Sequence, residues 1–260
     1  MRKDRIRHTF AKKAIVLISF LTITIGANAN DLIKDLNYII RLGYNIGGTA
    51  PIGMPATIRS MNSYKIQPNF TLAFDVQKEF WGDWGLLVGV RIEDKGMKVD
   101  ATVKNYHMAM VKGGDKMEGY YTGNLVTEVD QGMLTIPVQA TYRINNNLRL
   151  KLGPYVSYLS TRKFSGYVYD GYLRHITPIG DKINIGDTEK TRGDYDFSDE
   201  MRHFQFGIDA GIDWQIYKRW GAYADLQWGV SGVHKSSFKT IEQTLYPIFG
   251  TVGIIFKLNN

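Results

Sequence analysis

Four histidines lie beyond the first 29 residues, and two of them have neighbours that could take part in catalysis. His234 lies between Ser231 and Ser236, and both His234 and His203 are near predicted strand ends. A serine, a histidine and a carboxylate can form a nucleophilic triad, but geometry decides whether they do. The other two fall in predicted loops: His107 and His175. We expect a protein that is not an enzyme, with a lipid-modifying hydrolase at His203 and His234 as the alternative.

An acidic segment, residues 194–200, spaces oxygen ligands like the start of a calcium-binding loop. An EF-hand has glycine at the sixth position and glutamate at the twelfth, where this chain has Asp199 and Gln205. The pattern excludes an EF-hand, and a solvated acidic loop explains the segment better than a looser calcium site. The chain has no cysteine, which excludes disulfides and thiolate ligands. We expect neither a metal nor a cofactor.

The elements that would position these groups are β-strands. In HFQFGIDAGIDWQI at 203–216, apolar and polar residues alternate from Phe204 to Ile216. Such alternation is typical of a strand with two different faces. The pattern occurs eight times, near residues 38–47, 66–78, 84–100, 131–144, 147–163, 203–216, 220–231 and 245–258. No helical apolar stripe competes, so the sequence predicts an all-β protein.

The connections between the predicted strands alternate in length. Those after the second, fourth and sixth strands are short, at 80–83, 144–146 and 217–219, and residues 167–200 form the longest of the others. This asymmetry is typical of outer-membrane barrels. The sequence thus predicts an eight-stranded antiparallel up-and-down transmembrane β-barrel with periplasmic termini and long extracellular loops. A soluble barrel that binds a small ligand is the alternative, because eight strands suit that class too.

The apolar face of the strands is predicted to meet lipid. The polar face is rich in glycine, which weakens a water-facing sheet but in a narrow lumen would make room for a neighbouring arginine. One strand contains Pro137, which we expect to require a bulge. Aromatic residues near the strand ends resemble the interfacial girdles of a membrane barrel: Tyr38, Phe80, Trp81, Trp84, Tyr142, Tyr217 and Trp220 on the short-turn side, and Tyr158 and Tyr246 on the other.

Charged residues of both signs occupy the predicted inward face. Five are basic and six are acidic: Arg41, Arg91, Arg143, Arg149 and Lys151, with Asp75, Glu79, Glu93, Asp209, Asp213 and Asp225. Buried charges persist when they are paired and hydrogen-bonded. We therefore expect a salt-bridge network that closes the lumen, and the alternative is a path lined for an ion or a ligand. A general pore is not expected, because side chains fill the interior of an eight-stranded barrel.

The first 29 residues are typical of a secretory signal peptide. The basic segment MRKDRIRHTFAKK precedes a short apolar run at 14–25, and Ala27-Asn28-Ala29 fits the cleavage pattern. Residues 30–260 would then form the barrel domain. The signal segment holds six Lys or Arg and one Asp, so it carries +5 of the net charge of +7. The remaining +2 gives no electrostatic case for binding nucleic acid.

Three segments carry a resemblance to a known family: MLTIPVQATYRI at 133–144, LRLKLGPYVSYL at 148–159 and FGIDAGIDWQI at 206–216. They resemble the PorT-like outer-membrane β-barrel family of the Gram-negative cell envelope, over nearly all of residues 30–260. The resemblance implies the fold and admits a role in protein secretion, but that family is functionally mixed. We expect a non-enzymatic protein with a structural, adhesion or assembly role. Its partners would be outer-membrane lipid and envelope or secretion proteins that the sequence does not name.

Overall fold

The computed structural model describes residues 35–53, 55–241 and 243–259. The predicted signal peptide, residues 1–29, lies outside these ranges and stays a prediction. Within them the chain forms one short 3-10 helix, Ser198–Glu200, and eleven strands: β1 (Leu36–Pro51), β2 (Ile58–Ile66), β3 (Phe70–Trp81), β4 (Trp84–Lys112), β5 (Asp115–Arg143), β6 (Leu148–His175), β7 (Lys182–Ile185), β8 (Gly193–Asp196), β9 (Phe204–Tyr217), β10 (Trp220–Gly229) and β11 (Leu245–Lys257). No helix among the described residues is long and apolar enough to cross a membrane.

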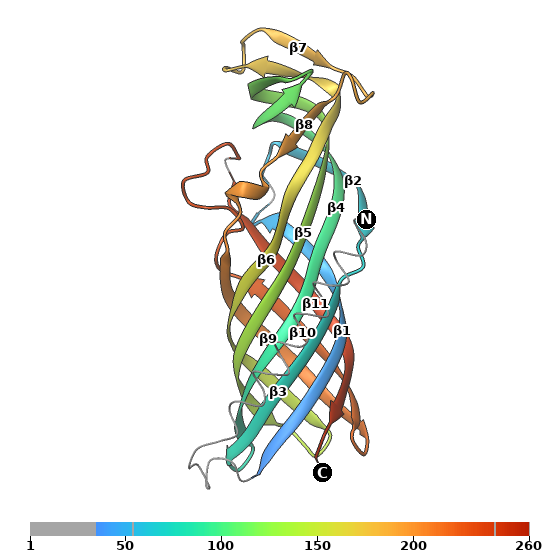
Figure 1. The fold of residues 1–260 in the computed structure, drawn as a ribbon, viewed down its shortest axis with the longest axis vertical. Helices are drawn as coiled ribbons and strands as arrows, with labels where there is room; N and C mark the ends of the chain where they lie inside the picture. Colours follow the sequence, from blue (N-terminus) through green and yellow to red (C-terminus); the bar gives the residue numbers. More distant parts are fainter. Residues whose placement is uncertain (1–34, 54, 242, 260) are drawn as a thin grey trace. The chain divides into compact units, whose positions relative to one another are not determined.

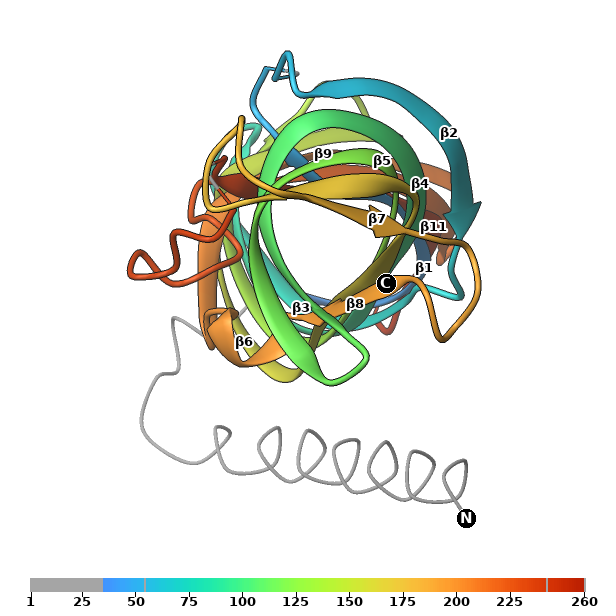
Figure 2. The same cartoon turned by 90° about the horizontal axis from the view of Figure 1, so that it is seen from above.

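Eight of the strands close into a barrel. In chain order these are β1, β3, β4, β5, β6, β9, β10 and β11, and each lies beside the next in an up-and-down arrangement. The barrel closes between β1 and β11, whose antiparallel register is unbroken from Ile39–Lys257 to Pro51–Leu245. Figure 2 shows the resulting ring of strands from above. The predicted eight-stranded antiparallel barrel is confirmed.

Short turns join the barrel strands at one end. The β3–β4 turn is Gly82–Asp83, the β5–β6 turn spans 144–147, and the β9–β10 turn is Lys218–Arg219. Gly82 has φ of +57° and Lys218 has φ of +46°, the left-handed backbone that two-residue hairpins require. The predicted short connections are therefore found, and they define what we call the short-turn end.

At the opposite end the predicted long loops are largely wrong. The segment between the third and fourth predicted strands, residues 101–130, continues β4 and β5 into a hairpin that turns at Gly113 and Gly114, with φ of +59° and +97°. Residues 167–200 contain the end of β6 together with β7, β8 and the 3-10 helix. Neither segment shows the unbroken alternation of apolar and polar residues from which the barrel strands were predicted.

Three strands are much longer than a bilayer crossing requires. β4 and β5 have 29 residues and β6 has 28, whereas about 9–11 residues cross a membrane. Their distal halves, residues 94–112, 115–132 and 160–175, run beyond the ends of the other barrel strands (Figure 1). There β2 pairs with β4, and β7 and β8 pair with β6. We call these distal halves, with β2, β7 and β8, the extension.

The interiors of the barrel and the extension differ in kind. The buried residues of the barrel are mainly polar, and those of the extension form an apolar core around Met108, Tyr121, Phe164, Val168 and Leu173. β2 pairs with only one strand, and most of its nine residues are exposed, so it carries no alternating pattern. This explains why it was missed in the sequence.

Pro137 does not sit at a bulge, so that expectation was wrong. It faces Tyr155 of β6, and the register shifts between β5 and β6 lie elsewhere, at Thr122/Asn124 and Gly132/Met133. The ladder to β4 keeps one register on both sides of the proline, from Val88–Val138 to Arg91–Thr135. The proline is therefore tolerated by leaving its place in the β4 ladder unpaired, without an inserted residue.

Candidate functional site: the charged lumen

The polar face of the barrel strands is the buried one. In β9, Phe206 and Ile208 are exposed, whereas Gln205 and Asp209 are buried. Among the described residues nine charged side chains are buried in the barrel: Arg41, Asp75, Arg91, Glu93, Lys95, Lys151, Asp209, Asp213 and Asp225. A water-soluble barrel has the opposite arrangement, because burial of apolar surface drives its folding. The exposed apolar face therefore suits lipid.

Arg41 of β1 connects three strands. Its Nε donates to Asp75 of β3, and its Nη1 and Nη2 donate to the two carboxylate oxygens of Asp213 of β9, at 2.6 and 2.8 Å. Two parallel hydrogen bonds from one guanidinium to one carboxylate are a strong, oriented pairing. Lys151 of β6 lies 2.9 Å from Asp213 and 2.7 Å from Asp225 of β10. This layer thus spans five of the eight barrel strands.

Arg91 of β4 forms the next layer. Its Nη1 lies 2.6 Å from Asp209 of β9 and 3.5 Å from Asp225 of β10. Its Nη2 donates to Gln139 of β5 at 3.3 Å. Asp225 therefore belongs to both layers, because it also faces the charge of Lys151. The two layers form one continuous network across the lumen.

Glu93 and Lys95 complete the network toward the extension. Lys95 donates to Glu93 at 3.1 Å and also to Gln227 of β10, and Thr135 of β5 donates to Glu93 at 2.6 Å. Every buried charge in the described barrel thus has an opposite charge beside it. Such a network fills space and fixes the strands, and it leaves no row of free charged groups for a passing ion.

Three of the predicted lumen residues lie apart from this network. Glu79 accepts from Arg143 at 2.9 Å and from Arg149 at 2.7 Å, and Arg143 also donates to Asp83 at 3.1 Å. The side chain of Arg143 is 36 % exposed, so this cluster forms the mouth at the short-turn end. A small apolar cluster of Ile39, Tyr223 and Ile255 lies beside the Arg41 layer, where the guanidinium of Arg41 is 5.1 Å from the centroid of the Tyr223 ring.

Sequence reasoning missed the uncharged members of the network and one lysine. Lys95 continues the inward alternation of Arg91 and Glu93 and could have been found by extending that pattern. The glycines also act differently from our expectation. A Cβ at Gly89 would collide with Asp75, and one at Gly211 would collide with Asp225. Glycine therefore makes room for carboxylates in the described lumen.

The predicted aromatic residues lie on the outer face of the barrel. Trp81, Trp84, Tyr217 and Trp220 are exposed near the short-turn end, and Tyr158 is exposed near the other. Phe80 and Tyr142 are also exposed, and Tyr38 and Tyr246 are half-buried. Rings from neighbouring strands pack together, with centroids 4.9 Å apart for Trp84 and Tyr142. Additional exposed aromatics that sequence reasoning omitted are Phe70, Phe204, Phe206, Trp214 and Trp228.

The two rim histidines do not form a triad. His203 is exposed and its ring stacks on Tyr158. His234 packs between the rings of Phe164 and Phe238, at 4.6 and 4.8 Å, and its Nε2 is buried with no hydrogen-bond partner. Burial lowers the pKa of His234 to about 4. A neutral imidazole held between phenylalanines is a packing residue.

The remaining histidines and the acidic segment also lack the arrangement that chemistry would need. His107 and His175 were each predicted to lie in a loop, but His107 lies within β4 and His175 is the last residue of β6. Asp194 pairs with Arg192 at 2.8 Å, and Asp196 accepts from the backbone N–H of Ser198. No group of three or more His, Asp or Glu side chains in the described ranges is placed to hold a metal ion.

A family model described as an outer membrane protein β-barrel domain matches residues 26–235. The chain belongs to that family. Membership in this family explains why the barrel buries its polar face and exposes its apolar face, because a protein of the outer membrane turns its apolar face to lipid. The lumen network is thus the interior of an outer-membrane barrel.

Solved structures similar to this outer-membrane barrel share little sequence with it. The attachment invasion locus protein Ail of Yersinia pestis is 12 % identical, with 86 % of this chain and 99 % of that chain covered and a TM-score of 0.38. The translocator domain of the autotransporter NalP from Neisseria meningitidis is 11 % identical, with 96 % and 97 % covered and a TM-score of 0.25. Comparison with curated proteins gives no match.

Proposed function

We propose that this protein is neither an enzyme nor a pore but an anchor, a closed barrel that presents the extension outside the cell for a structural, adhesion or assembly role. The observation that carries this proposal is the lumen, where nine charged side chains are buried and paired across the barrel. Porins with an aqueous channel use about 16–18 strands. The eight-stranded barrel with this interior supports anchoring better than transport.

The turns and the outer surface support one orientation of the anchor. Short turns face the periplasm in outer-membrane barrels, so the short-turn end would be periplasmic and the extension extracellular. The outer face of the extension suits water, because Glu128 pairs there with Lys98 at 3.4 Å and with Lys163 at 2.5 Å. The PorT-like resemblance of the barrel strands supports an assembly or secretion role for the exposed part.

A protease site inserted at each end tests the orientation. One variant carries the site between Gly113 and Gly114, where an added Cβ would meet nothing within 4 Å, and the matched control carries it between Asn146 and Asn147. Protease added to intact cells should cut the first variant and leave the second whole. Cleavage of the control alone would overturn the proposed orientation.

A shortened hairpin tests whether the extension carries the function. Lys98 and Glu128 face each other across β4 and β5, so Gly113-Gly114 can join them directly and remove the distal strands. Heat-modifiable mobility in electrophoresis would show whether the barrel still folds. We expect a folded variant that fails to restore the envelope phenotype of a deletion strain. Full restoration would show that the distal strands are not the functional part.

Lipid analysis tests the hydrolase alternative. The deletion strain, the strain complemented with the wild type, and a strain carrying the His203→Ala, His234→Ala double variant should have the same outer-membrane lipids. A lipid species that changes on deletion and is restored by the wild type but not by the double variant would establish an enzyme.

A further inference from the structure

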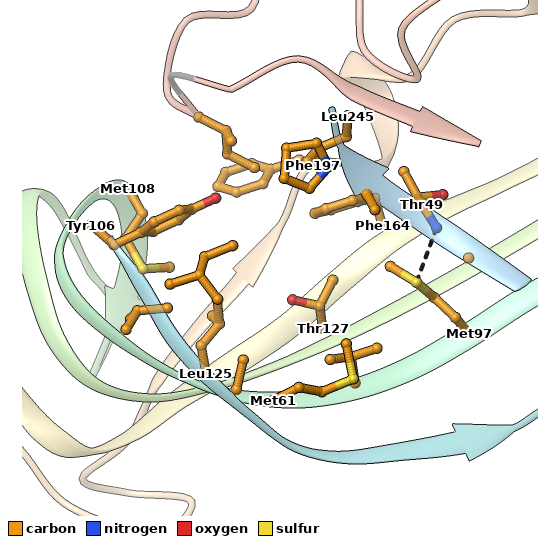
Figure 3. A pocket seen from close by; sticks show the side chains of 18 of the residues that line it. Thr49, Met61, Met97, Tyr106, Met108, Leu125, Thr127, Phe164, Phe197 and Leu245 are labelled. Carbon is orange, nitrogen blue, oxygen red and sulfur yellow. Dashed lines mark hydrogen bonds between the residues drawn. The ribbon is translucent and has the colours of Figure 1, made fainter. Parts of the chain in front are cut away.

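The extension contains an apolar cavity of about 310 Å³. It lies beyond the charged lumen, between β2, β4, β5 and the upper ends of β1 and β11 (Figure 3). Native interiors contain few voids larger than a water molecule, because each void removes packing contacts. The apolar side chains that line this cavity therefore lack packing partners unless something fills it.

The lining determines what could fill the cavity. Its walls are formed mainly by aliphatic, methionine and aromatic side chains, including Met97, Val103, Met108, Leu125 and Phe164. Among the described residues, no Asp, Glu, Lys, Arg or His lines it. Burial raises the pKa of the Tyr195 hydroxyl above its usual range, so this group stays neutral too. A charged group inside would be unpaired and costly, so the occupant is neutral and apolar.

One polar atom in the wall has no partner within the described part of the protein. Thr49 is 7 % exposed, and its Oγ1 is buried without a hydrogen bond, although its backbone N–H donates to the sulfur of Met97 at 3.2 Å. A buried hydroxyl without a partner is destabilising. Thr127 and Tyr195, by contrast, satisfy each other at 2.7 Å. A ligand with a single hydroxyl could pair with Thr49.

The cavity reaches the surface at the junction between the barrel and the extension. Four of its lining residues are exposed: Met61 and Tyr64 on β2, Ala50 on β1 and Ile248 on the outward face of β11. Tyr64 reaches across from β2 and donates to the carbonyl of Gly47 on β1 at 2.6 Å. Flexible methionine side chains adapt to ligands of different shape. The route to the cavity thus begins where the apolar band of the barrel ends.

We propose that this cavity binds a hydrocarbon chain that is neutral or ends in a hydroxyl. An engineered cavity of about 150 Å³ holds benzene, so the present volume corresponds to a chain of roughly twelve carbon atoms by the same scale. The chain comes either from a bilayer lipid at the barrel surface or from a free lipophilic molecule. The two sources share one chemistry, and the site stands whichever role the extension plays.

Photocrosslinking in nanodiscs tests the proposal directly. One arm uses 1-dodecanol with a diazirine on its chain, and the other uses a phosphatidylethanolamine with the same diazirine on an acyl chain. Peptide mapping should find crosslinks at Met97, Met108 or Phe164 in at least one arm. Labelling from the lipid arm would identify a bilayer chain, and labelling from the alcohol alone would identify a free ligand. Labelling of these residues in neither arm would overturn the proposal.

Variants distinguish binding in the cavity from general partition into the membrane. Ala101→Phe fills the cavity from β4 and should reduce the cavity crosslinks at least tenfold, whereas Ala109→Phe is the same substitution on the same strand away from the cavity and should leave them unchanged. Equal labelling in a folded Ala101→Phe protein would overturn the proposal.

Thr49→Val is the second variant, because it keeps the shape of the side chain and removes only the hydroxyl. It should weaken competition by unlabelled 1-dodecanol about fivefold, the effect of one neutral hydrogen bond, and leave competition by dodecane unchanged. Unchanged labelling together with unchanged competition by both compounds would show that Thr49 does not contact the ligand and would overturn the hydroxyl part of the proposal.

Discussion

Lys95 and Met97 lie two residues apart on the inward face of β4, and the interior changes from charged to apolar between them. Lys95 is hydrogen-bonded to Glu93 and Gln227, whereas Met97 belongs to the apolar core of the extension. The outward face changes in the opposite sense, from the apolar Val88 and Val90 to Asp94 and Lys98. The inversion of both faces marks the boundary between the barrel and the extension.

Removing one partner from the lumen network should destabilise the barrel strongly. Asp213→Leu would leave Arg41 and Lys151 without the carboxylate that both contact, and breaking a buried ion pair costs about 3–5 kcal/mol. Urea titration of the refolded protein in lipid vesicles measures this. The control Asp83→Leu removes an exposed partner at the mouth and should change stability by about 1 kcal/mol or less. Equal effects of the two changes would contradict a sealed network.

The purified protein should form no porin-sized channel in a planar bilayer. Two layers of paired charges cross the lumen, and the apolar cluster of Ile39, Tyr223 and Ile255 lies beside the Arg41 layer. Steady conductance of porin size from the unmodified protein would mean that the network opens. Heat-denatured protein serves as the control for bilayer damage.

Acid should weaken the extension through His234. The pKa of His234 is about 4 in the folded protein and 6.5 is the ordinary value, so the unfolded chain takes up a proton first as pH falls. The contribution of this group to stability is complete above pH 6.5 and declines toward pH 4. His234→Phe should remove that part of the pH dependence, as read by hydrogen exchange of β6 amides. His203→Phe, at an exposed site, should change nothing.

The distal hairpin should depend on its two glycines. Gly113 and Gly114 have φ of +59° and +97°, and a Cβ added at either would meet nothing within 4 Å, so replacement by alanine adds backbone strain without a clash. We expect about 1–2 kcal/mol per left-handed residue. Faster hydrogen exchange in the distal parts of β4 and β5 measures the loss, and the barrel amides provide the internal reference. Unchanged exchange in the Gly113→Ala, Gly114→Ala double variant would contradict the tight turn.

The barrel could be predicted from sequence because lipid imposes a strict pattern on it. Phe206, Ile208 and their counterparts on other strands must be apolar, and the residues between them are free to be polar, so the two faces alternate visibly. The extension follows no such rule. Its apolar residues, such as Met97 and Val103, point inward and alternate with outward polar residues, which is the reverse of the arrangement in the barrel. The register shift between Val103 and Tyr106 then interrupts this alternation.

Specific partners in the lumen could be predicted only in part. The alternation placed Arg41 and Asp213 on the inward face, but their distance depends on the register of strands 172 residues apart in sequence. The predicted site at His203 and His234 was wrong for the same reason, namely that contacts between distant segments cannot be read from the sequence. The loop that carries His234 folds against Phe164 of a distant strand. The cavity had no sequence signal, since its walls are ordinary core residues.

The continuity of β4 and β5 from the extension into the barrel has a mechanical consequence. A pull on the hairpin at Gly113 and Gly114 would run along both strands, and the hydrogen bonds between antiparallel strands lie perpendicular to that direction. Because β4 and β5 would be pulled in the same direction, the ladders of β4 with β3 and of β5 with β6 would carry the load in shear. A surface structure attached to the hairpin would therefore transmit force into the membrane-embedded wall without a hinge between the two.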